Sequence, residues 1–319
     1  MEQSPVDNPA SQEPPSLFSR IWQVLRWLPL LLMLLTIGAL LVWFIEGGLK
    51  KITAWYLLQF VPPLLGLFFV VAILFYAATK QRFGRLMLVT LIIALVSLSP
   101  IILWVMPIAY PASLETTTPS ATIRLPADAP LKVLWGGDKI ETNYHAMVPD
   151  QRWAYDLAIA PYLTGSAKLE DYGCYGVPVV APVRGQVSSA HDGEPDATPG
   201  VTSNNFEAPT GNHVVIHLET DTYLVIAHLK QGSVAVKSGD RVEEGQVIGQ
   251  CGNSGNTSEP HIHIHHQRQD PAVYPINFAE GLPLYFRDHD GPPMPDGGVK
   301  VETDDKMTAT GATVQHIGK

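Results

Sequence analysis

Three long apolar stretches within the first 110 residues constrain the fold more than any other feature of the chain. They cover Leu28–Ile45, Trp55–Ala78 and Leu86–Pro107, and none of them contains Asp, Glu, Lys or Arg. Each reaches the roughly 18–20 residues that a helix needs to cross a bilayer, and core helices of soluble proteins are rarely so long and so uniformly apolar. We therefore predict three transmembrane helices in residues 1–110, in contact with a lipid bilayer.

Basic residues in the short connections predict the orientation of these helices. Placing the N-terminus and the second connection inside puts five basic residues inside and two outside, as expected from the excess of Lys and Arg in cytoplasmic loops. The inside set is Arg20, Arg26, Lys80, Arg82 and Arg85, and the outside set is Lys50 and Lys51. A polar leader precedes the first stretch and no small-residue cleavage site follows it, so we expect an uncleaved anchor.

Charge divides the chain into two unlike parts. Residues 1–110 hold seven Lys or Arg and four Asp or Glu, a net charge of +3. Because the whole chain carries −9, residues 111–319 carry −12. An acidic region repels phosphate backbones, so we expect no nucleic-acid partner.

The two cysteines, Cys174 and Cys251, both lie in the acidic part. Neither belongs to a Cys-x-x-Cys pair, so a cysteine zinc site is not supported. If this part lies outside the cytoplasm the two can form a disulfide; the alternative is two free, partly buried thiols.

Composition changes again after the third apolar stretch. Residues 111–130 are rich in Ser, Thr, Pro and Ala and predict an extended, extracytoplasmic linker. Residues 131–290 consist of short β-type runs broken by Gly, Pro and Asn, so we predict a mostly β domain. The segment His191–Gly211 predicts a surface loop, over one end of a cleft, and residues 291–319 predict a loose polar tail. The predicted strands are Trp153–Ile159, Val177–Val180, Gly185–Ser189, His213–Leu218, Tyr223–His228, Gln246–Gly249 and His261–His265.

A run of histidines lies in the last of these strands, in the sequence Glu259-Pro-His-Ile-His-Ile-His-His266. Alternate residues of a strand share a face, so His261, His263 and His265 point the same way. His261 and His263 can then both reach one bound ion or its water, and imidazole is a good zinc ligand. A polar strand face that happens to be rich in histidine is the alternative.

Two further candidates lie in apolar strands. His228 ends the run Tyr223-Leu-Val-Ile-Ala-His228, as a buried strand leading into a site does, although a single histidine in such a place is more often structural. Asp156 lies in Trp153-Ala-Tyr-Asp156-Leu, where a carboxylate is costly unless it is paired or bound to a metal. An ion pair with Arg152 is the alternative to a metal for Asp156.

Six motif blocks follow one another between about Tyr144 and Tyr285. They are Trp153-Ala-Tyr-Asp-Leu157, Gly176-Val-Pro-Val-Val-Ala-Pro-Val-Arg-Gly-Gln-Val187, Gly211-Asn-His-Val-Val-Ile-His217, Tyr223-Leu-Val-Ile-Ala-His-Leu229, Val236–Gly249 and Gly252-Asn-Ser-Gly-Asn-Thr-Ser-Glu-Pro-His-Ile-His263. In this order they resemble the lysostaphin-like, LytM-like zinc metallopeptidases, or β-lytic endopeptidases. Any one block alone is a weak signal.

The resemblance implies a compact, mostly antiparallel β fold of the duplicated-hybrid-motif type, with a groove over the sheet. It implies a zinc metalloendopeptidase that cuts the peptides of peptidoglycan. By position, Asp156 and His263 resemble the family's zinc ligands, and His261 and His228 the two histidines that handle protons and stabilise the transition state. Together with the orientation that the basic residues predict, this function puts the domain, residues 131–290, on the periplasmic side of the bacterial inner (cytoplasmic) membrane, beyond a multi-pass anchor with a cytoplasmic N-terminus.

The chain departs from the family at one ligand. The family's first zinc-binding histidine lies four residues before the aspartate, and here that position is Arg152, which cannot bind a metal. His145 lies eleven residues before Asp156, far enough for a loop to return it to the ion, so we predict His145 as the third ligand. The other candidates are His265 and, less favoured, His191 and His213.

Two other functions compete with an active peptidase. A catalytically silent relative would bind the cell wall or regulate another wall hydrolase; Arg152 is its only support, and the retention of the family's other histidines favours activity. The turn Ser238–Gly249 is similar to that of lipoyl and biotinyl carrier domains, but neither Lys230 nor Lys237 lies in the Met-Lys setting they need. We interpret this turn as a shared hairpin shape.

Overall fold

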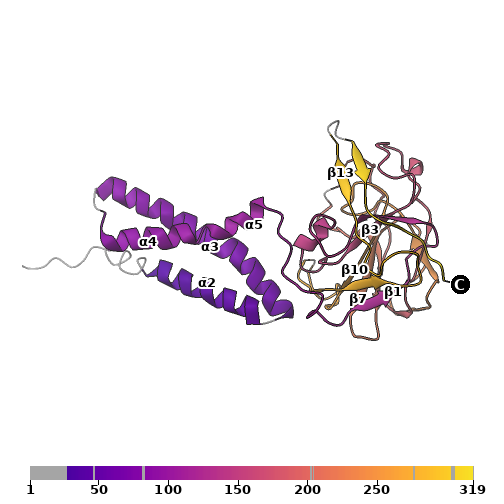
Figure 1. Ribbon diagram of the computed structural model, residues 1–319, viewed down its shortest axis with the longest axis horizontal. Helices are drawn as coiled ribbons and strands as arrows, with labels where there is room; N and C mark the ends of the chain where they lie inside the picture. The colour runs from indigo at the N-terminus through magenta and orange to yellow at the C-terminus, as the bar shows by residue number, and fades with distance from the viewer. Residues whose placement is uncertain are drawn as a thin grey trace, which may run out of the picture. The chain divides into compact units, whose positions relative to one another are not determined.

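The computed structural model describes residues 27–45, 47–80, 83–201, 203, 205–275, 277–302 and 306–318. The predicted cytoplasmic leader, and with it Arg20, Arg26 and the loop residue Arg82, lies outside the described residues. The chain divides into two compact units, Met1–Val105 and Met106–Lys319 (Figure 1).

The first unit consists of apolar helices. These are α2 (Leu28–Ile45), α3 (Gly48–Lys80), α4 (Arg85–Val96) and, after the 3₁₀ turn η1 (Ser99–Ile101), α5 (Ile102–Val105). By length and composition, the helical segments Gly48–Thr79 and Arg85–Val105 can cross a membrane, which supports the second and third predicted spans. The apolar part of α2, Leu28–Val42, is shorter, and the first span remains a prediction.

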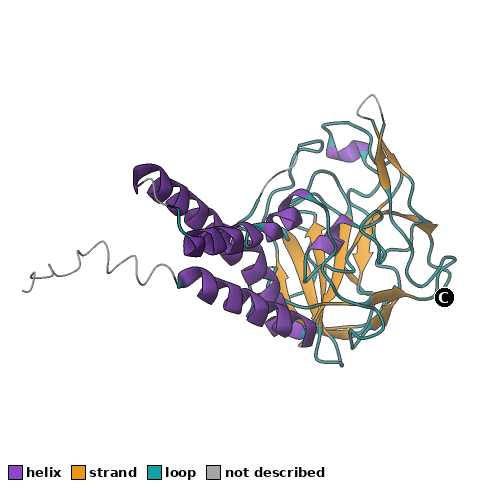
Figure 2. Ribbon diagram, turned by 60° about the vertical axis from the view of Figure 1, so that its left-hand side comes forward, coloured by secondary structure: helices purple, strands orange, loops and turns teal. Residues whose placement is uncertain are grey.

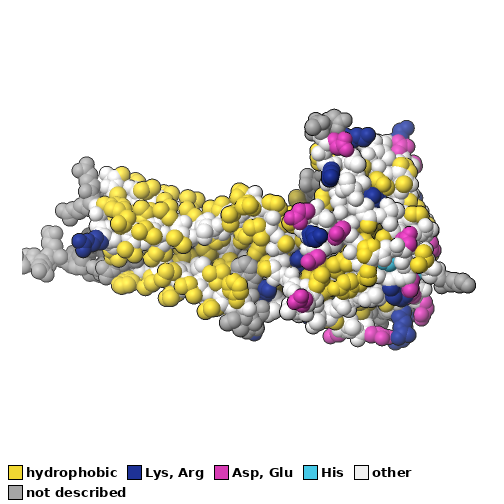
Figure 3. Space-filling view, in the orientation of Figure 1, with side chains coloured by type: hydrophobic (Ala, Val, Ile, Leu, Met, Phe, Trp, Pro, Cys, Tyr) yellow, Lys and Arg dark blue, Asp and Glu magenta, His cyan; other side chains and the backbone are white. Residues whose placement is uncertain are grey.

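The helices of this unit pack against one another while leaving apolar side chains exposed. α3 contacts both α2 and α4. At Gly66 a Cβ would lie 2.7 Å from the Ala94 carbonyl oxygen, so glycine is what allows α3 and α4 to approach this closely, as small residues do between membrane helices. Many outward Leu, Phe and Val side chains are exposed, and hydrophobic side chains cover most of the helices in Figure 3. Such a surface is costly in water and fits contact with lipid.

The second unit is mostly β (Figure 2) and is organised around a nine-stranded sheet. Its order is β15-β2-β3-β10-β7-β6-β5-β8, with β11 also paired to β10. The bounds are β2 Leu131–Trp135, β3 Tyr155–Ala158, β5 Gly185–His191, β6 Asn212–His217, β7 Tyr223–Leu229, β8 Arg241–Val242, β10 Ile262–Gln267, β11 Gly281–Leu282 and β15 Thr313–Val314. Three two-stranded pairs complete the unit: β1 (Ala121–Ile123) with β12 (Leu284–Phe286), β4 (Pro178–Val180) with β9 (Val247–Gln250), and β13 (Val299–Val301) with β14 (Met307–Ala309).

The main sheet has one core face and one site face, because successive side chains of a strand point to opposite sides. On β10, Ile262 and Ile264 belong to the hydrophobic core, together with residues of β1, β4, β9 and β12. His263 and His265 alternate with them and therefore point to the other face. There Val225 and Ala227 of β7 form a small separate apolar cluster with Val215.

The predicted β character of this unit is confirmed. Each predicted strand overlaps an observed strand, and the described residues after Met106 contain no helix beyond two 3₁₀ turns, η2 (Tyr144–Met147) and η3 (Leu169–Asp171).

Two predictions about the ends of this unit are wrong. The predicted loose tail contains β13, β14 and β15, and β15 joins the main sheet beside β2 with Val314 buried. The predicted linker, residues 111–130, is not a free tether from Ala121 onward, because β1 pairs with β12 and Leu125 is fully buried. Strands of two or three residues leave almost no periodic signal in the sequence. Both predictions therefore rested on composition alone, and the short strands were not recognised.

Candidate metal centre

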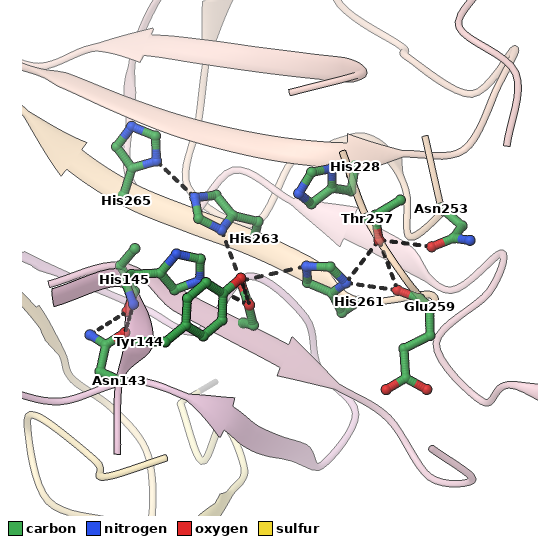
Figure 4. A network of polar contacts seen from close by, with 12 residues as sticks. Asn143, Tyr144, His145, His228, Asn253, Thr257, Glu259, His261, His263 and His265 are labelled. Carbon is green, nitrogen blue, oxygen red and sulfur yellow. Dashed lines mark hydrogen bonds and ion pairs between the residues drawn. The ribbon is translucent and has the colours of Figure 1, made fainter. Parts of the chain in front are cut away.

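The centre is built on a pair of residues that face each other across two strands. β3 and β10 are antiparallel, and Asp156 lies directly opposite His263, so their side chains share a face. His263 Nδ1 lies 2.8 Å from Asp156 Oδ1, and His261 Nε2 lies 3.5 Å from the same oxygen. The carboxylate is 4% exposed. Figure 4 shows these imidazole rings converging from β10.

The turn η2 brings His145 to the same carboxylate. His145 Nε2 lies 2.9 Å from Asp156 Oδ2. The side chain of Asn143 holds this turn: its Oδ1 accepts from the His145 amide, and its Nδ2 donates to the carbonyls of Gly137 and Ala154. Because Ala154 directly precedes β3, one buried asparagine fixes the turn to the strand that carries Asp156.

His228 reaches the centre from the end of β7. Its φ of 62° lies in the left-handed region, an uncommon conformation for a residue other than glycine and typical of functional sites. The His228 amide donates to Thr210 O at 3.0 Å. Gly211, with a φ of 56°, permits the turn around Ser254 to approach, since a Cβ there would lie 2.4 Å from the Ser254 carbonyl carbon.

Backbone carbonyls fix the ring nitrogens of two histidines. His228 Nδ1 donates to Ser254 O at 2.8 Å, and His261 Nδ1 donates to Glu259 O at 2.7 Å. A carbonyl can only accept, so in the neutral ring the proton lies on Nδ1 and Nε2 is left with a free lone pair. His261 directs that Nε2 toward Asp156, and the two rings lie 4.8 Å apart between centroids.

Burial and the neighbouring charges set the protonation of the centre. Burial holds the pKa of His228 and of His265 well below the ordinary value, and lowers that of His263 less strongly. Burial alone would raise the pKa of Asp156, but the imidazoles of His145 and His261 outweigh it and hold that pKa well below its usual range. The pKa of His261 is raised, because the Asp156 carboxylate overcomes the opposing effect of burial.

This donor set fits a divalent metal ion. Among the described residues, one ligand atom from each of His145, Asp156 and His263 lies within 4.8 Å of the others, and His228, His261 and His263 form a second such group. The lowered pKa values of His228 and His263 favour neutral imidazoles and that of Asp156 an ionised carboxylate, which are the forms that bind a metal. The structure therefore brings together all five residues singled out from the sequence.

Arg152 is committed elsewhere, so an ion pair with Asp156 does not form. Its Nε donates to the Tyr110 carbonyl at 3.0 Å, and its Nη1 donates to the Asp138 carbonyl at 2.9 Å. Nη2 also lies 2.9 Å from the Asp138 carboxylate. Tyr110 in turn donates from its amide to Ala146 O at 2.7 Å. Arg152 thus joins the segment before β1 to the turn that carries His145.

The other histidine candidates, all within the described residues, make no hydrogen bond or ion pair with Asp156. His191 and His213 stack on each other with centroids 5.8 Å apart, and neither belongs to the two metal-type groups found among the described residues. His265 contacts His263 rather than Asp156, with its Nδ1 2.9 Å from His263 Nε2.

Tyr144 was missed from the sequence. Its hydroxyl donates to Asp156 Oδ2 at 3.4 Å, and its ring lies 4.1 Å from the His145 ring between centroids. Burial, and then the Asp156 charge, raise the pKa of Tyr144, so the hydroxyl remains a donor. The available signal was its position directly before His145.

A cavity of about 300 Å³ lies beside the centre on the site face. His265 and Gln267 line it from β10, and Phe206 and Tyr274 line it with apolar surface. Phe206 belongs to the predicted loop His191–Gly211, two residues of which, 202 and 204, lie outside the described residues. The loop therefore contributes to the wall of a cavity next to the histidines.

A disulfide lies close in sequence to the same region. Cys174 and Cys251 are bonded, with Cα atoms 5.7 Å apart and a sequence separation of 77. Of the two alternatives left open by the sequence, the structure shows the disulfide. Cys251 directly precedes the turn whose Ser254 and Glu259 carbonyls hold His228 and His261.

A buried carboxylate ringed by imidazoles, on one face of a mostly β unit, defines a candidate metal centre. Residues 170–275 match the family described as Peptidase family M23, so the second unit carries a domain of this peptidase family, and the predicted lysostaphin-like resemblance is confirmed. The matched residues include His228, His261 and His263 and begin after Asp156.

One curated relative is the peptidoglycan DD-endopeptidase ShyC of Vibrio cholerae, 35% identical over 89 residues. That match spans 28% of this chain and 18% of the relative. Among solved structures, lysostaphin from Staphylococcus simulans is 20% identical with a TM-score of 0.31, covering 47% of each chain. A zinc-containing peptidase from Vibrio cholerae is 20% identical with a TM-score of 0.29, covering 45% of this chain and 37% of that chain.

Proposed function

We propose that the chain is a membrane-anchored zinc metalloendopeptidase that hydrolyses peptide bonds of peptidoglycan stem peptides or cross-bridges. The observation that carries this proposal is the approach of His145, Asp156 and His263 within one buried centre, beside two further imidazoles. His145 takes the place of the family's usual first histidine ligand, whose position is occupied by Arg152 in this chain. The catalytic domain is residues 131–290, extended by β1 and β15.

Zinc is the metal that the donors favour. Two imidazoles and one carboxylate are a common protein ligand set for catalytic zinc, which leaves a position for water. When bound, zinc supplies Lewis acidity, which makes a water molecule more acidic and a carbonyl carbon more electrophilic.

His228 and His261 handle protons in this proposal. Each holds its Nδ1 proton on a backbone carbonyl and leaves Nε2 free, so each can accept a proton or, once protonated, donate one to a leaving amine. His261 lies nearer Asp156 and has the raised pKa, which suits it to accept the proton. His228 is held neutral by burial, so its Nε2 lone pair can accept a hydrogen bond from the attacking water and orient it.

The anchor, the disulfide and the substrate class support a location for this proposal. The predicted spans and the basic residues flanking them favour a second unit outside the cytoplasm. A disulfide such as Cys174–Cys251 persists in an oxidising compartment. Peptidoglycan, which the ShyC name assigns as that relative's substrate, lies in the same space. We therefore propose the periplasmic side of the bacterial inner membrane, with peptidoglycan peptides and lipid as the partners.

Digestion of purified peptidoglycan tests this function. We expect the zinc-loaded chain to convert cross-linked muropeptides to uncross-linked ones, measured by chromatography of the digested wall. His261→Ala and His228→Ala should each lower the rate by about 10²–10⁴-fold, while His217→Ala, at a half-exposed histidine paired with Asp221, should retain it.

The competing function is a silent relative that binds wall or regulates another hydrolase. Its support is Arg152 at the usual ligand position. Full zinc loading with no cleavage of any cross-link, together with binding to intact wall, would establish that alternative instead.

A further inference from the structure

We propose that His265 and Gln267 form a hydrogen-bond relay that fixes the ring tautomer of His263 and thereby makes Nδ1 its metal-binding atom. This inference rests on the proposed metal centre, and it adds two positioning residues that are not themselves ligands. Both are buried, at 4% and 3% exposure, and both line the cavity on the site face of β10.

The relay starts at a group whose role is fixed. The Gln269 carbonyl can only accept, and Gln267 Nε2 donates to it at 2.6 Å. This orients the Gln267 amide, so that Oε1, which can only accept, faces His265 Nε2 at 3.0 Å. The proton of His265 therefore lies on Nε2.

The tautomer of His265 in turn determines that of His263. A neutral His265 with its proton on Nε2 has a lone pair on Nδ1, which lies 2.9 Å from His263 Nε2. His263 Nε2 must then donate, and the His263 proton lies on Nε2. The remaining nitrogen, Nδ1, is left with its lone pair directed at Asp156 Oδ1, 2.8 Å away.

This tautomer of His263 is the opposite of the one that Asp156 alone would favour. A single carboxylate beside an imidazole favours a proton on the facing nitrogen, which would block Nδ1 as a ligand. With the relay, two electron-rich atoms face each other at hydrogen-bond distance, an arrangement that a cation between them stabilises. Partners on the far nitrogen of a metal-binding histidine commonly set its tautomer in this way.

The next residue of β10 supplies a matched control. His266 is as deeply buried as His265, but it points to the opposite face, where its Nε2 lies 2.8 Å from Thr222 Oγ1 and its Nδ1 3.3 Å from Pro283 O. Replacing either histidine by Phe removes two ring hydrogen bonds from the same strand. Only the replacement of His265 interrupts the relay.

Zinc affinity of the full chain in detergent, measured by competition with a chromogenic chelator, tests the relay. His265→Phe should weaken zinc binding by about 10–100-fold, and His266→Phe should leave it within about threefold of the parent. Should His265→Phe fail to fold, Gln267→Met removes the acceptor at the far end and should weaken binding in the same direction. Gln267→Glu keeps an acceptor for His265 Nε2 and should preserve the affinity.

A second readout reports the tautomer itself. In the metal-free chain, ¹⁵N chemical shifts of the histidine rings should show the His263 proton on Nε2 in the parent and a shift toward Nδ1 in Gln267→Met. A merely structural role for Gln267 would leave that tautomer unchanged.

The outcomes separate the relay from the proposed function. Parent-like zinc affinity in both His265→Phe and Gln267→Met, or equal loss in His266→Phe, overturns the relay while leaving the zinc site intact. A parent chain that binds no zinc overturns the metal centre and the relay together. Wall digestion is scored separately and does not enter this test.

Discussion

Arg152 shows how one residue can change its role without removing the site around it. Where the family's pattern has a ligand, this chain has a buried guanidinium that bonds the Tyr110 and Asp138 carbonyls and the Asp138 carboxylate. In our proposal the missing ligand is supplied by His145, which lies eleven residues before Asp156 in the sequence and 2.9 Å from its carboxylate. The sequence predicted this replacement because no other histidine precedes Asp156.

We predict that Arg152→Met lowers the free energy of unfolding without removing the metal. The change removes the Arg152 donor from the buried Tyr110 carbonyl and the partly buried Asp138 carbonyl, at a cost of about 1–3 kcal/mol. Urea denaturation of the second unit in the solubilised chain measures this cost, and zinc analysis checks the centre. Unchanged stability combined with lost zinc would show that Arg152 acts on the centre directly.

Acid should destabilise the metal-free chain through its buried histidines. Burial lowers the pKa of His266 from 6.5 to about 4. Between these two pH values, His266 binds a proton in the unfolded chain but not in the folded chain. Stability then falls as the pH drops from about 6.5 to about 4, and His266 alone contributes a loss of about 2 kcal/mol by pH 5. Urea midpoints at pH 7.5 and 5 measure the slope, and His266→Gln should flatten it; an equal slope in that variant would contradict the assignment.

At the scale of the element, β10 was predictable and the turn η2 was not. Alternating isoleucines and histidines predict a strand with one core face and one polar face, and the pairing of His263 with Asp156 matches that pattern. His145 lies in a four-residue 3₁₀ turn whose position depends on the Asn143 side chain bonding Gly137 and Ala154. Such a contact between segments has no periodicity, so sequence supported His145 only by chain length and elimination.

The disulfide fixes the segment that leads into the turn whose Ser254 and Glu259 carbonyls hold His228 and His261. Replacing both Cys174 and Cys251 by Ser removes a cross-link spanning 77 residues and should lower the free energy of unfolding by about 2–5 kcal/mol. Thermal or urea unfolding, with the parent under reducing conditions as a second comparison, measures the loss. Identical stability of the variant and the oxidised parent would show that the bond does not form in the protein.

At the scale of the molecule, the division into an apolar helical unit and an acidic β unit followed from composition. The strand pairings that complete the β unit did not follow from composition. β1 reaches β12 and β15 reaches β2 through pairings of two or three residues, separated by more than 150 positions in the sequence. Local patterns cannot reveal such pairings, which depend on where the rest of the sheet has already placed the partner strand.

Orientation in the membrane is a prediction for the whole chain. A reporter that is active only outside the cytoplasm, fused after residue 319, should be active, and the same reporter fused before the first span should be inactive. Cysteines introduced at Lys50 and at Lys80 extend the test, since a membrane-impermeant thiol reagent should label only the first. The reverse labelling would place the peptidase unit in the cytoplasm and remove its access to peptidoglycan.

The central claim is that three side chains far apart in sequence bind one zinc ion. Anomalous diffraction at the zinc absorption edge, from crystals of the zinc-loaded protein, tests it most directly. We expect one strong peak about 2.0–2.2 Å from His145 Nε2, the Asp156 carboxylate and His263 Nδ1. A peak that Asp156 and His263 share without His145, or no peak between β3 and β10 at full zinc loading, would contradict the ligand set.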